Sequence, residues 1–473
     1  MTLPTLTARS RRTLLAVVLL PTILALIVCA LTIGKAGTNG DEPHYLIMAD
    51  SLVTDASFDL RPAYARDAQT AAIFGPVPPH MVFVQHRWMP FHTPGMSILI
   101  ALPFWLQGQA AVRIWLCLLM ALLPWSIVRW TRARLTPADA AWLTLGVVVC
   151  SPACFGGSRI FPDLPAGVFA TALALWLLNR EEDDARPLAW AGAGLAMGLL
   201  TWLNVKFVAT SGVFLAGLLG VAWHASRTAR PATARMALMS AGCLVVGPLG
   251  LVAFNVWAYD NLTGGRFIAE VASVPSRAAE IFLGLHLDQS QGMFVRNPLL
   301  LAGVLFLPLF FRRQPAQAAF WGLLYLSLIG PNSLELARYG GGAPTSRFAW
   351  PAMWLWAVPM VTGLAAYPRL RRYLPAATVV ALVYQAALAV RWLRTPDVLF
   401  PYLSEKIAER DSLFPLGIRG LLPSFYFWDF SSYWTYVPNL AAMLTVALIL
   451  VAGIALARSW PVRATGRDST GAA

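Results

Sequence analysis

The sequence contains few charged residues, and this scarcity excludes most classes of soluble protein. Asp, Glu, Lys and Arg make up 12% of its 473 residues, while hydrophobic residues make up 58% and the mean hydropathy is +0.60. A water-soluble chain of this length carries about twice that charged fraction. The composition therefore predicts an integral membrane protein that crosses the bilayer many times, with no soluble domain.

Acidic residues, cysteines and histidines are also scarce. There are 23 acidic residues against 36 basic ones, which gives a net charge of +13. The basic residues gather in short loops between apolar runs, as in cytoplasmic loops, so we expect membrane lipids and no nucleic acid as partners. The five cysteines lie inside or at the rim of apolar runs, which is typical of small buried side chains rather than of disulfides.

Apolar runs of a length that spans a bilayer repeat along the chain. The predicted spans are 13–33, 110–129, 138–155, 163–179, 187–204, 207–224, 236–257, 297–311, 316–332, 348–366, 374–391 and 437–457. The first run follows three arginines and could be a signal peptide, but no cleavage site is evident and we predict a retained helix. Residues 94–107 form a shorter apolar run, which predicts a re-entrant or interfacial helix.

The predicted fold class is thus an all-α polytopic membrane protein with about twelve transmembrane helices. Every second loop is short and basic, which places both termini in the cytoplasm and the chain in the plasma (inner) membrane. The whole chain, residues 1–473, is predicted to be one domain. The long external loop 34–109 opens it, and residues 371–473 add C-terminal helices and an aromatic-rich external loop at 392–436.

Ionisable residues gather at the outer ends of the predicted spans. Asp41 and Glu42 follow the first span, next to Pro43 and Tyr45, and a carboxylate in hydrocarbon is costly without water or a partner. The pair could be ordinary solvated loop acids near a helix N-terminus. We favour a functional interpretation, in which Asp41 and Glu42 are catalytic carboxylates facing a membrane-embedded substrate.

Other charged residues near this rim have two interpretations each. Asp163, between two prolines, could cap a helix or bind a divalent metal ion together with Asp41. Lys206 and Arg347 could reach the membrane surface or bind a phosphate, and we favour phosphate. Four of the six histidines lie in the first external loop, and of these His92 is the strongest candidate for a functional side chain.

Several motifs together resemble the type-C (GT-C) membrane glycosyltransferases, especially the protein O-mannosyltransferase and aminoarabinose-transferase branch. The resemblance covers about residues 10–370. It is carried by Asp41-Glu42, His92-Thr93-Pro94-Gly95, Pro162 to Ala166, Trp202 to Lys206, Leu287-Asp288-Gln289 with Gly292, and Gly340 to Phe348. One departure is Arg296, where we expect a neutral residue.

The resemblance implies a polyprenyl-phosphate-linked sugar donor and inversion at the anomeric carbon. It assigns Asp41 to acceptor activation, Asp163 to metal or acceptor binding, and Lys206 and Arg347 to the donor phosphate; Tyr45, His92 and Asp288 join the predicted substrate site. The acceptor would be a glycan, a lipid or a protein on the non-cytoplasmic face. The alternatives are a lipid or polysaccharide transporter or flippase, which would need a polar path across the bilayer, and a non-catalytic assembly subunit.

Overall fold

The computed structural model describes most of the chain. The described residues are 8–32, 38, 40–66, 79–149, 156–179, 186–265, 275–335, 346–394, 418, 420–425, 432 and 434–460. Two predicted features, the glycines at 340–342 and most of the aromatic loop 392–436, fall outside them.

Helices dominate the described part of the chain. The α-helices are α1 (Ala8–Thr32), α2 (Glu42–Asp50), α3 (Arg61–Arg66), α5 (Gly95–Leu119), α6 (Leu122–Thr131), α7 (Pro137–Val148), α9 (Asp163–Leu178), α10 (Pro187–Leu203), α11 (Val208–Arg227), α12 (Pro231–Tyr259), α14 (Ala278–Leu287), α15 (Met293–Arg296), α16 (Leu301–Arg313), α17 (Pro315–Ser333), α18 (Trp350–Met353), α19 (Ala357–Ala366), α20 (Leu374–Arg394) and α23 (Val437–Ser459). Short 3-10 or π segments are η1 (Ser51–Asp55), η2 (Val205–Phe207), η3 (Pro275–Arg277), η4 (Pro298–Leu300), η5 (Arg347–Ala349), η6 (Trp354–Trp356) and η7 (Pro368–Tyr373).

The helices confirm a multi-pass membrane protein. Among the described residues, seven helical segments are long and apolar enough to cross a bilayer. Each of the twelve predicted spans coincides with helix, although several of those helices are too short to qualify by length. The count of twelve, the orientation of the termini and the single-domain boundary stay predictions.

The predicted short helix before the second span is present. α5 runs from Gly95 to Leu119, but Gln107 and Gly108 have non-helical backbone angles, and the φ of Gly108 is 59°. Glycine adopts that left-handed conformation without steric cost. The break divides α5 into an N-terminal helix that matches residues 94–107 and a second helix that matches the start of the predicted span 110–129.

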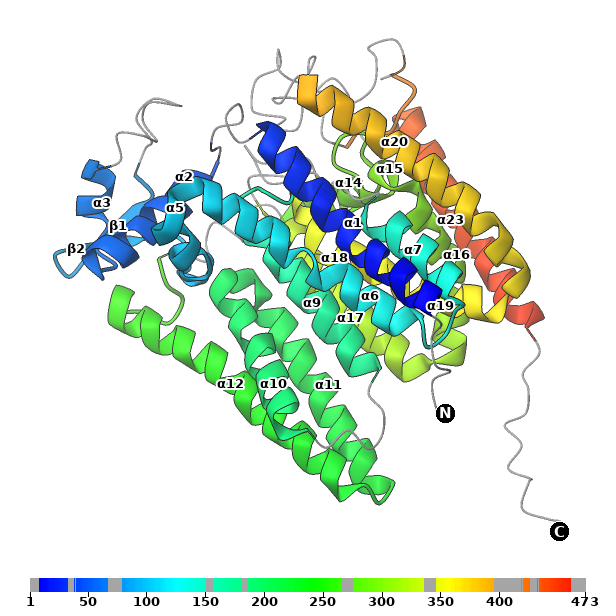
Figure 1. Cartoon of the computed structure of the whole chain (residues 1–473), viewed down its shortest axis with the longest axis horizontal. Coiled ribbons are helices and arrows are strands. Elements are labelled where there is room, and N and C mark those ends of the chain that lie inside the picture. Colours follow the sequence, from blue (N-terminus) through cyan, green and yellow to red (C-terminus); the bar gives the residue numbers. More distant parts are fainter. Residues whose placement is uncertain are drawn as a thin grey trace.

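The described residues between α1 and α5 form a small structure at one end of the bundle, at the left of Figure 1. It contains α2, η1, α3 and an antiparallel hairpin of β1 (Met81–Val84) and β2 (Arg87–Pro90). This hairpin is an exception to the all-α prediction. Its turn residues Gln85 and His86 both have positive φ, 48° and 64°, which is the backbone that a two-residue hairpin loop requires.

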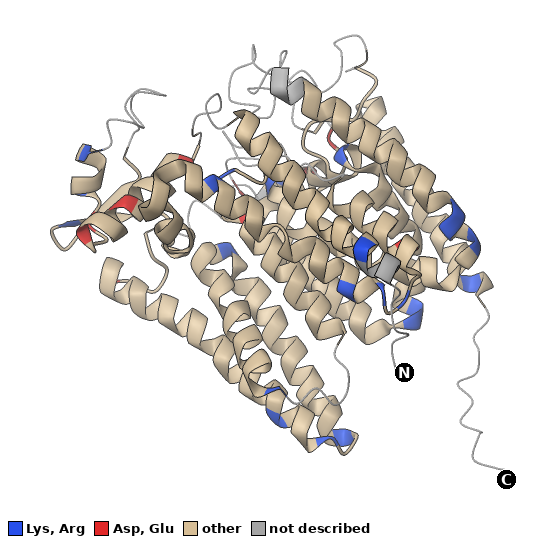
Figure 2. Ribbon diagram, viewed as in Figure 1, with Lys and Arg blue, Asp and Glu red and all other residues tan. Residues whose placement is uncertain are grey.

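Close packing of small residues organises the helices. α10, α11 and α12 form a neighbouring group (Figure 1), and a Cβ at Gly198 on α10 would overlap the carbonyl oxygen of Leu244 on α12. The segment from Arg347 to Ala366 is almost wholly buried at the centre of the bundle. Figure 2 shows that Lys and Arg lie mainly at helix ends, while the helix bodies are almost free of charge.

Candidate active site

Asp41 lies where the chain enters α2, with its carboxylate free of any capping role. Its backbone oxygen accepts the N–H groups of His44 and Tyr45 at 3.1 and 3.3 Å, and Pro43 occupies the first turn, where no N–H is needed. Its side chain makes no capping hydrogen bond and is 30% exposed. The carboxylate therefore points toward other elements of the protein.

The motif His92 to Gly95 contacts the C-terminal end of α10. The Thr93 hydroxyl donates to the carbonyl oxygen of Leu203 at 3.1 Å. A Cβ at Gly95 would overlap the backbone carbonyl of Trp202, so only glycine permits this approach. The contact places His92 beside the segment that carries Lys206.

Lys206 lies in a short break between the helices α10 and α11. Asn204 leaves the helical conformation, and its side-chain oxygen accepts the Lys206 N–H at 3.1 Å, which starts the short turn η2. The Lys206 ammonium then donates to Asp163 Oδ1 at 2.5 Å and to Asn332 Oδ1 at 2.9 Å. Its side chain is only 9% exposed, so this cation is held inside the protein.

Arg347 joins the two predicted acids. Its Nη1 lies 3.5 Å from Asp41 Oδ2 and its Nε lies 3.5 Å from Asp163 Oδ2. Its guanidinium also packs 4.3 Å from the ring centroid of Phe161. Among the described residues, its buried Nε has no hydrogen-bond partner. Asp41, Arg347, Asp163 and Lys206 thus form one continuous charged cluster from four separate parts of the chain.

The charges of this cluster hold Asp41 ionised. Burial raises the pKa of Asp41, but His92 and Arg347 beside it more than compensate, and the pKa falls from 3.8 to about 2. A carboxylate with such a pKa remains negative throughout the physiological range. It can accept a proton only from a group that becomes strongly acidic during a reaction.

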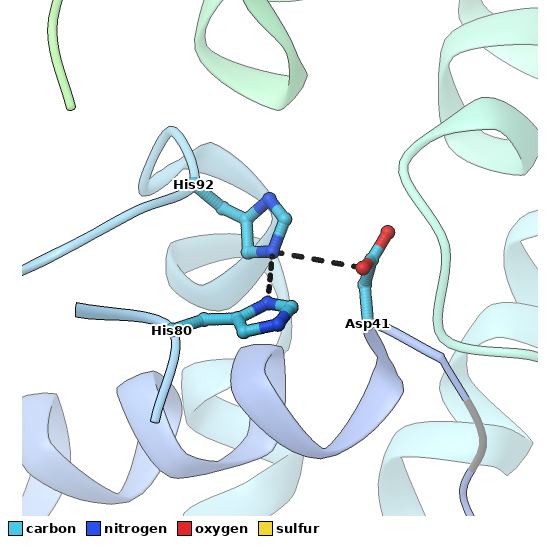
Figure 3. A group of neighbouring side chains, drawn as sticks. All are labelled: Asp41, His80 and His92. Carbon is cyan, nitrogen blue, oxygen red and sulfur yellow. Dashed lines mark hydrogen bonds and ion pairs between the residues drawn. The ribbon is translucent and has the colours of Figure 1, made fainter. Parts of the chain in front are cut away.

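The side chains of Asp41, His80 and His92 form a group that could hold a metal ion (Figure 3). His92 Nε2 lies 3.7 Å from Asp41 Oδ1 and 3.3 Å from His80 Nδ1, and the three ligand atoms lie within 4.8 Å of one another. Ligands of a tetrahedral zinc ion are about 3.4 Å apart, given metal–ligand distances near 2.1 Å. These residues fit a divalent ion, whereas Asp163, predicted as the second ligand, is instead engaged by Lys206 and Arg347.

His44 and Tyr64 support this group from the loop side. The His44 ring stacks on His80 with centroids 3.7 Å apart, and its Nδ1 lies 2.7 Å from the Tyr64 hydroxyl. The same hydroxyl accepts a hydrogen bond from the backbone N–H of His80 at 3.0 Å. Burial, with His80 and His92 close by, lowers the pKa of His44 to about 3, so His44 is neutral.

Three other predicted site residues contact other parts of the protein. Glu42 is fully buried, accepts the Ile160 N–H at 2.8 Å and lies 3.7 Å from Arg159. The Tyr45 ring packs against His92 with centroids 5.1 Å apart. Asp288 is fully buried in the turn after α14, where its carboxylate accepts backbone N–H groups. Glu42 and Asp288 therefore act on neighbouring backbone in this structure.

An apolar groove is lined partly by residues a few positions along the chain from His92 and Lys206. Its volume is about 390 Å³, and its lining comes from α5, α9 and α10. Two of its lining residues, Gly95 and Leu203, belong to the segments that carry His92 and Lys206. An apolar chain in this groove would have its polar end near the charged cluster.

Two further residues of the site, Arg159 and Asn332, are not singled out by the sequence. Burial lowers the pKa of Arg159 to about 10, against the opposing effect of Glu42, so it stays a cation at neutral pH. Asn332 bridges Lys206 and the carbonyl oxygen of Phe348 at 2.8 Å. Arg159 lies within the motif that contains Asp163 and could have been noticed there, whereas a single asparagine near a helix end gives no signal.

Comparison with known proteins finds a likeness in fold but none in sequence. No protein-family model and no curated protein sequence matches the chain. In fold, the chain is similar to the solved protein ArnT. The apo crystal structure of ArnT from Cupriavidus metallidurans aligns with a TM-score of 0.50 at 15% identity, over 93% of this chain and 74% of ArnT. ArnT bound to undecaprenyl phosphate aligns with a TM-score of 0.48 at 13% identity, over 93% and 78%.

Proposed function

We propose that this protein is an integral-membrane glycosyltransferase that moves a monosaccharide from a polyprenyl-phosphate donor to a hydroxyl of a glycan, lipid or protein. The active site would lie on the non-cytoplasmic face of the plasma membrane. The observation that carries the proposal is the cluster in which Arg347 lies between Asp41 and Asp163, with Lys206 on the far side of Asp163.

The two cations suit the donor phosphate. The leaving group of such a transfer is an anionic polyprenyl phosphate, and cations already in place stabilise the charge that develops on it. The guanidinium of Arg347 is held by carboxylates 3.5 Å away, longer than the charge-assisted hydrogen bonds of about 2.8 Å that arginine forms at close contact. Arg347 therefore retains hydrogen-bonding capacity for a phosphate.

Asp41 suits activation of the acceptor. Its low pKa makes it a weak base toward a free hydroxyl. As the acceptor's hydroxyl oxygen bonds to the anomeric carbon, the proton on that oxygen becomes strongly acidic and can pass to the carboxylate of Asp41. Attack from the face opposite the phosphate inverts the configuration of the sugar. Asp41 thus acts late in the transfer, when the new bond is largely formed.

The group of Asp41, His80 and His92 is proposed to hold a divalent metal ion. Such an ion would acidify or orient a bound hydroxyl. The imidazole and carboxylate ligands favour zinc or a similar transition metal over magnesium. His44 and Tyr64 hold the His80 side of the group in place through the contacts described above.

The groove between α5, α9 and α10 is proposed to receive the isoprenoid chain. Its lining is apolar, from residues such as Ile98, Leu199 and Phe169, and it opens beside the segment of Lys206. A phosphate bound by Lys206 and Arg347 would then direct its chain into the bilayer along this groove.

The experiment uses full-length protein in proteoliposomes with labelled polyprenyl-phosphate sugars and membrane extract as the source of acceptor. We expect transfer by the wild type, a loss of about 100-fold or more in Asp41→Asn, and weaker donor use in Arg347→Ala. Asp50→Asn, an acid elsewhere on α2 that pairs with Arg66, is the matched control. A wild type that binds and transfers none of these donors would overturn the proposal and leave a transporter or an assembly subunit.

A further inference from the structure

The side chain of Gln291 contacts the start of the segment that carries Arg347. The side-chain oxygen Oε1 of Gln291 accepts the backbone N–H of Ser346 at 2.7 Å. Gln291 is 2% exposed and Ser346 is fully buried. Ser346 has a φ of 63°, in the left-handed region that is unfavourable for a residue with a Cβ. The hydrogen bond from its N–H helps to hold this unfavourable conformation.

Gln291 is itself held rigidly by Asp288. The Asp288 oxygen Oδ1 accepts the N–H groups of Ser290 and Gln291 at 2.8 and 2.9 Å, and Oδ2 accepts the N–H of Phe425 at 2.8 Å. Asp288 is fully buried, so water does not compete for these bonds. The turn between α14 and α15 therefore holds the backbone of Gln291, from which its side chain reaches Ser346.

The direction of the Arg347 side chain depends on this backbone position. Arg347 begins the short turn η5, which the hydrogen bond from Ala349 N to Ser346 O closes at 2.8 Å. Its two ion pairs of 3.5 Å attract the guanidinium but do not have the short, directional geometry that would fix it by themselves. A shift at Ser346 would therefore move the guanidinium relative to Asp41 and Asp163.

We infer that Gln291 is a positioning residue for Arg347 and thereby sets the affinity of the site for a polyprenyl phosphate. This inference rests on the proposed phosphate-binding role of Arg347. Gln291 acts on Arg347 indirectly, because its side-chain oxygen accepts the backbone N–H of Ser346, the residue before Arg347. Its contribution should disappear when Arg347 is absent.

The test measures binding of free polyprenyl phosphate to the purified full-length protein. Gln291→Leu removes the acceptor and should weaken binding about fivefold to tenfold, the range expected for one hydrogen bond. Gln291→Glu keeps an oxygen at the same place and should bind within about threefold of the wild type. In the Arg347→Ala background, Gln291→Leu should cause no further loss. Ser211→Ala, which removes another buried side-chain bond to backbone, is the control and should bind normally.

Each contrary result has one meaning. Normal binding by Gln291→Leu, or a full additional loss in the double variant, overturns the inference while the proposed function stands. Absent binding in the wild type, or normal binding by Arg347→Ala, overturns the proposed function and this inference with it. If Gln291→Leu does not fold, as thermal unfolding would show, Gln291→Met offers the same loss of acceptor with a flexible side chain and carries the same comparison.

Discussion

The ammonium of Lys206 lies 2.5 Å from the carboxylate of Asp163, although the two residues come from different helical segments and are both almost fully buried. Arg347 shares the same carboxylate through its other oxygen. One acid thus pairs with both cations. Asp41, the second carboxylate of the cluster, balances the remaining positive charge.

Removing the charge of Asp163 should destabilise the protein and make it depend on ligand. Breaking a buried ion pair costs about 3–5 kcal/mol, because the remaining cations are left buried without compensation. We expect Asp163→Asn to lower the thermal unfolding temperature, and polyprenyl phosphate to restore more stability in this variant than in the wild type. An equal ligand effect on the two proteins would contradict this account of the cluster.

Glu42 is expected to support the site without accepting the proton of the acceptor. Its carboxylate holds the Ile160 N–H and pairs with Arg159, and the next residue, Phe161, lies under the Arg347 guanidinium. Glu42→Gln keeps an acceptor for Ile160 and should retain a measurable part of the transfer rate, while Glu42→Ala should lose much more. If Glu42→Gln were as inactive as Asp41→Asn in the same transfer assay, Glu42 would have a direct catalytic role.

The histidine group predicts a bound metal ion. Protein purified without chelators should contain about one equivalent of a divalent transition metal by elemental analysis, since the three ligand atoms have suitable spacing. His80→Ala and His92→Ala should both lose the metal. His86→Ala is the control, because His86 lies in the hairpin turn of the same loop. Metal-free wild-type protein with full transfer activity would rule out a metal requirement.

The apolar groove predicts a dependence on the length of the isoprenoid chain. Ala196→Trp would fill the groove between α5, α9 and α10 and should raise KM for a long-chain donor about tenfold, with little effect on a donor of one or two isoprene units. A second apolar groove of about 700 Å³, lined by α15, η4, α16 and α20, gives the control Ala381→Trp. Equal effects of the two substitutions, or an effect independent of chain length, would place the isoprenoid chain elsewhere.

Hydrophobic patterning predicted the helices well because a span needs a long apolar run whatever its neighbours are. It even separated residues 94–107 from the following span, where Gln107 and Gly108 break α5. It missed the hairpin of β1 and β2, because the turn at Gln85 and His86 lacks the Asn-Gly or Asp-Gly signal that marks such turns. Its count of twelve spans and their orientation remain predictions, since membrane topology needs a test of its own.

The sequence indicated which residues belong to the candidate site, but it could not indicate which of them form ion pairs with one another. Asp41, Asp163, Lys206 and Arg347 stand out in the sequence as charges at the ends of apolar runs, where burial without function is costly. Which carboxylate meets which cation depends on contacts between residues far apart in the chain. The expected metal pair of Asp41 and Asp163 illustrates this, because the structure places His80 and His92 beside Asp41 and two cations beside Asp163.

The sequence by itself determined that this is a multi-pass membrane protein with its acids and cations at helix ends, because the bilayer imposes length and polarity on every segment independently. Only the tertiary structure decided that Arg347 lies between Asp41 and Asp163, that Glu42 binds the Ile160 backbone, and that Gln291 holds Ser346. Those relationships arise from helix packing, in which close contacts such as Gly95 against Trp202 fix the positions of distant segments.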